Sequence, residues 1–215
     1  MKKTIFYFMT LLLLPKMHAT VIWQGTNVVD VINENILITS NCKLTNNITE
    51  IHATECDVTV EITKDALIEA QQNAQYIYVE AVWPYSVTFK VHHDLEFRGV
   101  ENQPTEDLQI YVYGNGAIRW EIDEDSKLKF NSTSSSGGVK LWISYDNNFP
   151  IHIFKVSRQH QITFGKRCSI GYSIEGNCGT TALETFIEAD DANTDMPYII
   201  MDETSQFAVK LIAVG

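Results

Sequence analysis

Short runs in which apolar and polar residues alternate dominate the chain. They are rich in Val, Ile, Tyr, Phe and Trp, the residues that β-strands favour. Because successive side chains of a strand point to opposite faces, each run predicts a half-buried β-strand. Four runs share apolar residues at their first, third and fifth positions, the last of them less cleanly: Val58–Ile62, Val87–Val91, Ile118–Ile122 and His152–Val156.

The four similar runs begin 29, 31 and 34 residues apart, and other strand-like runs accompany them. A recurring unit of three strands in about thirty residues is typical of a solenoid. We therefore predict an all-β fold, a parallel β-solenoid (β-helix-like) with coils of roughly 30 residues, and keep an antiparallel β-sandwich or jelly roll as the alternative. The accompanying runs are Tyr76–Val79, Gln109–Val112 and Lys140–Ile143 before the similar runs, and Leu95–Phe97, Leu128–Phe130 and Ile162–Phe164 after them.

Stacking of the predicted coils would make equivalent residues neighbours, about 4.8 Å apart across parallel strands. The central apolar residues would then form one inward ladder, and the residues that follow them would face outward. These outward residues alternate in charge, which favours this register because like charges on adjacent strands repel. The inward ladder consists of Val60, Phe89, Trp120 and Phe154, and the outward one of Glu61, Lys90, Glu121 and Lys155.

A few segments depart from the strand pattern. Thr63–Ala74 consists of good helix formers with Thr63 as an N-cap, which predicts a short helix between strands. Gly114–Gly116 predicts a tight turn between two strands. Residues 181–189 fit either a helix or a strand, and two closing strands are predicted after them, at Tyr198–Met201 and Phe207–Leu211.

The N-terminus has the layout of a secretory signal peptide, with Lys2 and Lys3, the apolar run Ile5–Leu14 and the small residue Ala19. We predict a signal peptide over residues 1–19 and a single β-rich domain over 20–215, with coils at about 27–165 and a C-terminal cap at about 166–215. The apolar run is shorter than the about 20 residues of a membrane helix. We expect the mature chain to be secreted, periplasmic or at the cell surface, without a transmembrane segment.

The chain is acidic: its 215 residues include 16 Lys and Arg against 27 Asp and Glu, a formal charge of −11. Removal of the predicted signal peptide takes away three Lys and no acid, so the charge becomes −14. Nucleic-acid binding needs a basic footprint, and we therefore expect no nucleic-acid partner. A hydrophobic content of 45% is too high for a disordered chain.

The four cysteines form two sequence-local pairs, which in an oxidising compartment predict disulfides. We favour Cys42–Cys56 and Cys168–Cys178 among the three connectivities, because each pair flanks one loop. A zinc site made of all four thiolates is the competing interpretation. Spacings of fourteen and ten residues lack the tight knuckles that zinc usually takes.

The runs that precede the similar strands place an aromatic residue outward at the same position of successive coils. Aromatic strips of this kind stack on sugar rings or anchor a protein partner. The strip is either open to a ligand or covered by another part of the chain, such as the C-terminal segment. Its residues, our candidate ligand-binding set, are Tyr78, Tyr111 and Trp142.

The segment from Asp191 to Asp202 resembles the start of a calcium-binding loop of the EF-hand type, with oxygen ligands at alternate positions. Met196 stands where that loop needs Gly, so a solvated acidic loop is the alternative. We expect no cofactor and keep calcium as the one candidate. Its ligands would be Asp191, Asn193, Asp195 and Asp202.

Two acidic or histidine clusters are candidates for chemistry. The acidic turn that contains Asp123–Asp125 would suit glycoside hydrolysis if two carboxylates lay at a suitable separation. An acid recurs, however, three residues after each of the first three similar runs, at Asp65, Asp94 and Asp125, which predicts a structural role in capping backbone N–H groups. His92-His93-Asp94 is a candidate metal or proton-transfer cluster, although adjacent strand residues point apart.

No nucleophile elbow, zinc-protease helix or phosphate loop is present, so we expect binding rather than catalysis. The leading hypothesis is a secreted, non-catalytic surface protein that recognises a glycan or a cell-surface protein through the aromatic strip. One alternative is a carbohydrate-active enzyme, a polysaccharide hydrolase or lyase, that uses carboxylates. The other is a structural subunit that assembles through its strand edges.

Overall fold

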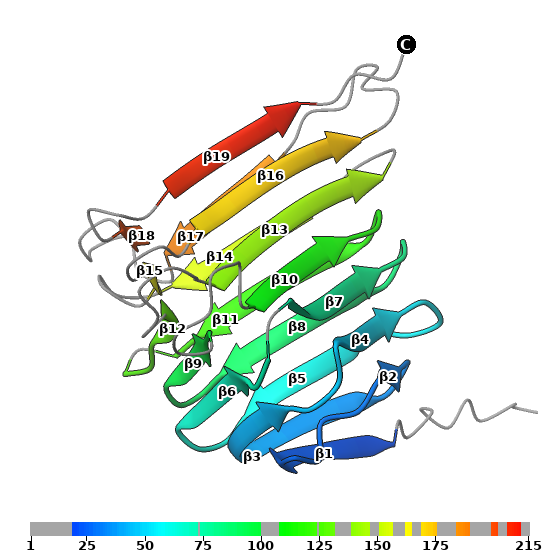
Figure 1. Ribbon diagram of the computed structural model, residues 1–215. Coiled ribbons are helices and arrows are strands. Elements are labelled where there is room, and N and C mark those ends of the chain that lie inside the picture. The colour runs from blue at the N-terminus through cyan, green and yellow to red at the C-terminus, as the bar shows by residue number, and fades with distance from the viewer. Residues whose placement is uncertain are drawn as a thin grey trace, which may run out of the picture.

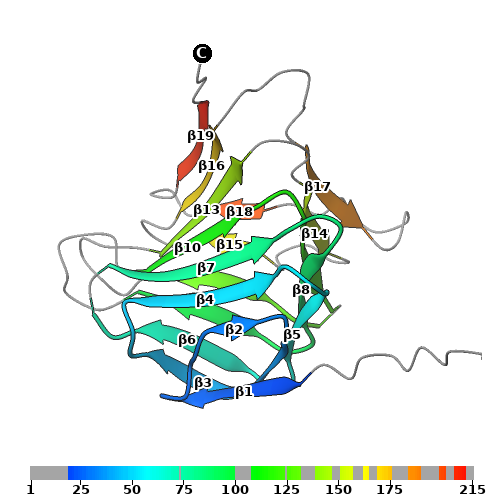
Figure 2. The ribbon, with the colours of Figure 1, turned by 90° about the vertical axis from the view of Figure 1, so that its right-hand side faces the viewer.

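The computed structural model describes residues 19–72, 74–99, 108–123, 125–131, 139–146, 151–156, 162–164, 169–175, 184–189, 199–201 and 206–211. These residues contain strands and no helix. The strands form three rows that enclose a common interior, and the chain visits the rows in turn (Figure 1, Figure 2).

The first row consists of β5 (Val58–Ile62), β8 (Ser86–Val91), β11 (Ala117–Ile122), β14 (Ile151–Val156) and β17 (Glu184–Ala189). The second row consists of β6 (Ala66–Ala70), β9 (Leu95–Arg98), β12 (Leu128–Asn131), β15 (Ile162–Phe164) and β18 (Ile199–Met201). The third row is a seven-stranded sheet of β2 (Val31–Ile32), β4 (Ile48–Ala53), β7 (Gln75–Ala81), β10 (Leu108–Tyr113), β13 (Val139–Asp146), β16 (Ser169–Glu175) and β19 (Gln206–Leu211).

The first two rows are joined at β3 (Asn35–Leu44), a strand of ten residues. Its first half pairs with β5, since Ile36 lies opposite Val60, and its second half pairs with β6, since Cys42 lies opposite Ile68. β1 (Thr20–Gly25) pairs with β3 from the other side. The two rows, β3 and β1 therefore make one twelve-stranded sheet that bends round the interior.

The predicted fold class is wrong. All strand pairs among the described residues are parallel, which excludes the antiparallel sandwich or jelly roll. The parallel β-solenoid is also corrected, to a nearly closed, barrel-like sheet of parallel strands (Figure 2). The physical reason is β3: because it is long enough to pair with two rows, it merges faces that the sequence pattern treats as separate.

The predicted lateral register is confirmed. Phe89 lies opposite Val60 on one side and Trp120 on the other, and Trp120 lies opposite Phe154. The residues that follow are paired in the same way, so Glu61, Lys90, Glu121 and Lys155 occupy adjacent positions. Inward side chains from all three rows form one buried core, in which Phe97 and Phe130 stack with ring centroids 5.5 Å apart.

The predicted helix over Thr63–Ala74 is wrong, because its centre is the strand β6. Inward and outward positions alternate along β6, with Ala66, Ile68 and Ala70 buried, so core packing overrides the helix propensity of the segment. The other elements expected in these segments are found. The turn at Gly114–Gly116 and the strands β17, β18 and β19 are present.

Polar side chains at the row ends bind the backbone of the next pass of the chain. Asp65 Oδ1 accepts the N–H of Asp94 at 3.1 Å, which confirms the capping role predicted for that acid. Asp57 Oδ1 accepts the N–H of Ser86 at 2.8 Å, and Asn35 Oδ1 that of Thr59 at 2.8 Å. Each bond satisfies a backbone donor where the strand pairing ends, which fixes one pass on the next.

Candidate functional site

The outer side of the third row carries the predicted aromatic strip. Tyr78 of β7 lies opposite Tyr111 of β10, which in turn lies opposite Trp142 of β13. The structure therefore places the three predicted residues at adjacent register positions. The side chain of Trp142 lies outside the described residues, so the part of the strip whose side chains are described consists of tyrosines.

Two tyrosines that our prediction missed belong to the same cluster. Tyr76 and Tyr113 stand two residues from Tyr78 and Tyr111, and the two-residue period of a strand puts them on the same side. That period is a signal the sequence already contained. We call the four side chains together the tyrosine face: Tyr76, Tyr78, Tyr111 and Tyr113.

The rings of the tyrosine face are in mutual contact. Tyr78 stacks on Tyr111 with centroids 5.4 Å apart and planes at 28°, and on Tyr76 at 5.9 Å and 19°. Tyr113 meets Tyr78 edge-on, at 6.0 Å and 84°. These distances lie within the range of favourable aromatic pairs, so the rings hold each other in place before any ligand arrives.

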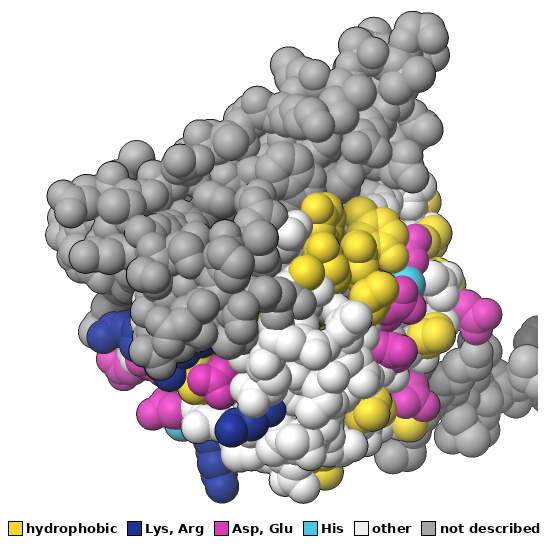
Figure 3. Space-filling model, in the orientation of Figure 1, with side chains coloured by type: hydrophobic (Ala, Val, Ile, Leu, Met, Phe, Trp, Pro, Cys, Tyr) yellow, Lys and Arg dark blue, Asp and Glu magenta, His cyan; other side chains and the backbone are white. Residues whose placement is uncertain are grey.

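The tyrosine face reaches the surface of the described part of the chain (Figure 3). Each of its four side chains is half-buried, while the alternate residues Ile77, Val79 and Ile110 are buried beneath them. Figure 3 shows hydrophobic side chains gathered at the surface over β7 and β10, with acidic side chains and a histidine beside them.

The histidine and acids beside the tyrosine face are His52, Glu50 and Glu80. His52 Nδ1 lies 2.6 Å from Glu80 Oε2, and its Nε2 lies 3.3 Å from Glu50 Oε2. The second contact lacks hydrogen-bond alignment, because Nε2 has no hydrogen-bond partner among the described residues. The pKa of the nearby Tyr113 hydroxyl is raised to about 12. Burial is the largest cause, and the charges of Glu80 and Glu50 follow.

The cluster predicted at His92-His93-Asp94 is divided among different partners. His92 Nδ1 lies 2.7 Å from Asp123 Oδ2, and its Nε2 lies 3.6 Å from Glu61 Oε1. His93 is directed to Asp65, at 3.9 Å, and the carboxylate of Asp94 accepts from Lys129 Nζ at 2.9 Å. Over the described part of the chain, no group of three His, Cys, Asp or Glu side chains is placed to hold a metal ion.

The predicted Cys42–Cys56 disulfide is not formed. Cys42 is a free thiol whose side chain points into the core from β3 and donates to the Ser40 carbonyl oxygen at 3.4 Å. Cys56 instead donates to the Asn33 carbonyl oxygen at 3.2 Å. Burial raises the pKa of the Cys42 thiol to about 11. Cys168 and Cys178 lie outside the described residues, as do the calcium candidates Asp191, Asn193, Asp195 and Asp202.

Comparison of the chain with protein-family models, with curated proteins and with solved structures finds no match. Within the described residues, no helix has the length and apolarity that crossing a bilayer requires. The tyrosine face, with its acidic neighbours, is the candidate functional site.

Proposed function

We propose that the protein is a non-catalytic binding protein that recognises a partner through the tyrosine face. The observation that carries this proposal is the contact of four half-buried tyrosine rings on one outer sheet surface. Tyrosine combines a large apolar ring with a polar hydroxyl and loses little conformational freedom on binding, which makes it the side chain that recognition surfaces favour. Export to the outside of the cell, indicated by the N-terminal sequence, is part of the same proposal.

The ligand classes that suit this surface are glycans and protein surfaces. Sugar rings present apolar C–H groups that pack on aromatic rings, and tyrosine hydroxyls bond to sugar hydroxyls. A protein partner would bury the same rings as anchors. Catalysis receives less support, because the carboxylates of Asp94 and Asp123 are engaged with Lys129 and His92.

The test is a double variant, Tyr78→Ala/Tyr111→Ala, screened beside the wild type against immobilised oligosaccharides and immobilised extracellular proteins. We expect a ligand of the wild type to bind the variant at least about tenfold more weakly, because two contacting rings are lost. Far-UV circular dichroism and the melting temperature report whether the fold is retained.

Trp83→Ala is the matched control, because Trp83 is an aromatic residue 69% exposed in the turn between β7 and β8 and is not one of the four rings of the tyrosine face. Its removal should leave the binding unchanged. A ligand that binds the double variant as well as the wild type, or is lost only in Trp83→Ala, would contradict the proposal.

A further inference from the structure

The tyrosine face and the acids beside it form one continuous surface. Glu50 lies opposite Tyr78 in the register of β4 and β7, and Glu80 lies opposite Tyr113 in that of β7 and β10. Parallel strands are about 4.8 Å apart, so each glutamate is the cross-strand neighbour of a tyrosine of the tyrosine face. Side chains of Glu50 and Glu80 are 42% and 25% exposed, which leaves both within reach of a ligand.

Acidic residues outnumber basic ones on this surface. The outward positions of β4, β7 and β10 include two Glu and one His, and no Lys or Arg. His52, the only basic residue at these positions, lies between the two carboxylates. The π-faces of the tyrosines add to the negative potential, since an aromatic ring is electron-rich above and below its plane.

A cation is the ligand group that both features attract. Ammonium and guanidinium groups bind over aromatic rings within about 6 Å of the centroid. Carboxylates beside the rings add a charge-assisted hydrogen bond, which is stronger than a neutral one. The edge-on arrangement of Tyr78 and Tyr113 offers two ring surfaces at nearly a right angle, with Glu80 next to Tyr113.

We propose that the tyrosine face binds a basic polypeptide segment, whose Lys or Arg side chains lie over the rings and pair with Glu50 and Glu80. This inference rests on the proposed function and names the class of its partner. A polypeptide suits the site better than a small ammonium compound, because Ile48 and Ile32, 45% and 60% exposed, extend the same outer surface along β4 and β2. A neutral glycan offers no positive charge to pair with the carboxylates, and an acidic one would be repelled by them.

The test titrates the full chain with hexa-arginine by calorimetry, with hexa-glutamate and cellohexaose as charge-reversed and neutral probes. The two informative variants are Glu50→Gln/Glu80→Gln, which removes the charges, and Tyr78→Leu, which keeps the apolar bulk and removes the aromatic ring. We expect hexa-arginine to bind the wild type, more weakly as salt rises, and each variant to bind it about tenfold more weakly.

The chain offers a matched control in Glu61→Gln/Asp123→Asn. Glu61 and Asp123 bracket His92 as Glu50 and Glu80 bracket His52, on a different sheet whose outward neighbours include no tyrosine. This control removes the same two charges and should bind hexa-arginine like the wild type. An equal loss in the control would reduce the effect to net charge and overturn the inference.

The remaining outcomes separate the inference from the proposed function. Binding of cellohexaose that Tyr78→Leu abolishes, without binding of hexa-arginine, would overturn the basic partner and keep the tyrosine face as a binding site. Binding of hexa-arginine that both variants retain, or no binding of it by the wild type, would also overturn the inference. The Tyr78→Ala/Tyr111→Ala screen decides the proposed function independently.

Discussion

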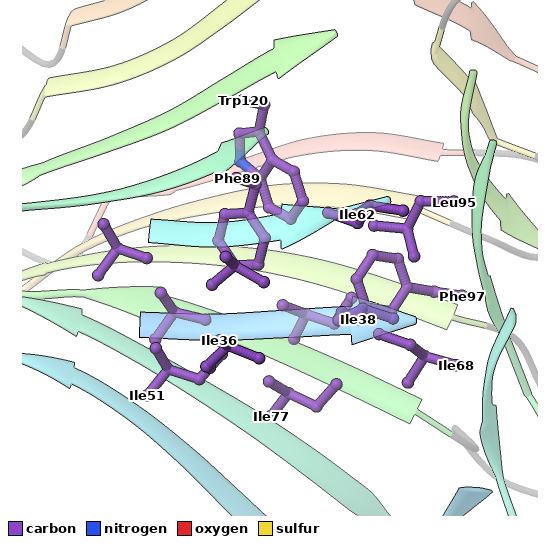
Figure 4. Packing of buried hydrophobic residues seen from close by; sticks show 14 of the residues in the cluster. Ile36, Ile38, Ile51, Ile62, Ile68, Ile77, Phe89, Leu95, Phe97 and Trp120 are labelled. Carbon is purple, nitrogen blue, oxygen red and sulfur yellow. The ribbon is translucent and has the colours of Figure 1, made fainter. Parts of the chain in front are cut away.

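Phe89 and Trp120 are 31 positions apart in the chain, yet their rings stack face to face with centroids 3.9 Å apart and planes at 8° (Figure 4). They come from β8 and β11, which are paired in parallel, and neither ring is exposed by more than 3%. Phe97 of the second row meets the same indole edge-on, at 6.3 Å and 81°. Trp120 is therefore a point at which two rows of the sheet are packed together.

Trp120→Ala should lower the free energy of unfolding by about 3–5 kcal/mol, because it removes a fully buried side chain and leaves a cavity between the rows. The measurement is equilibrium unfolding in urea. Trp83→Ala, at a position that is 69% exposed, should change the same quantity by no more than about 0.5 kcal/mol. Equal effects of the two substitutions would show that the Trp120 ring does not hold the rows together.

Gly116→Ala should destabilise the protein by about 1–3 kcal/mol through overpacking, because its Cβ would overlap the Tyr85 carbonyl oxygen and lie 2.7 Å from the Ala81 carbonyl carbon. Both neighbours are backbone atoms and have little freedom to retreat. A larger side chain should cost more again, so Gly116→Leu is expected to melt below Gly116→Ala.

Gly25 provides the comparison for that series. It has a left-handed φ of +57°, but a Cβ added there would meet no atom within 4 Å, so only backbone strain opposes a side chain at this position. Gly25→Ala and Gly25→Leu should therefore melt at similar temperatures. A size dependence at Gly25, or none at Gly116, would refute the steric explanation.

The pKa of Tyr113 should be about 12, raised from an ordinary value of 10.0, because partial burial and then the charges of Glu80 and Glu50 oppose ionisation of the hydroxyl. The folded state then holds this proton where the unfolded state has lost it. The contribution to stability is therefore complete below pH 10 and is lost as the pH rises towards 12.

The difference in tyrosinate absorbance between wild type and Tyr113→Phe isolates this group. Glu50→Gln/Glu80→Gln should move the titration to lower pH, since the two charges that oppose ionisation are gone. A titration at the ordinary value in the folded wild type would place Tyr113 away from the acids.

Cys42 should resist alkylation in the native protein, because its thiol is buried and its pKa is raised to about 11. Iodoacetamide labelling followed by peptide mapping should find Cys42 unmodified under native conditions and modified in denaturant without reductant. Detection of a Cys42–Cys56 linked peptide would instead contradict the free thiol and support the disulfide predicted from the sequence.

The sequence pattern predicted register better than architecture. Apolar residues at every second position identify the inward side of each strand, and the similarity of Val87–Val91 to Ile118–Ile122 was sufficient to pair Phe89 with Trp120. The pattern carries no information about which rows merge into one sheet. That depends on β3, whose pairing with both β5 and β6 is a tertiary property of a strand that reads like any other.

The same limit applies to the site. Alternation placed Tyr78 and Tyr111 on the outer side, but the contribution of Glu50 and Glu80 depends on which strand lies next to β7. The failed helix at β6 and the absent Cys42–Cys56 bridge share one cause. The helix propensity of β6 and the short sequence separation of Cys42 and Cys56 are both outweighed by the burial of inward-facing side chains.

Because β3 joins two rows of the sheet, deletions in β3 and deletions in the later strands should have different effects. Ser86 and Ala117 are register partners, so a chain lacking residues 86–116 would run from Tyr85 directly into a strand already aligned with the pass below. Deletion of Asn35–Leu44 would instead leave β5 and β6 without their common neighbour. We therefore expect the fold to tolerate insertion or deletion of a whole three-strand unit after β3, and not to tolerate deletion of β3 itself.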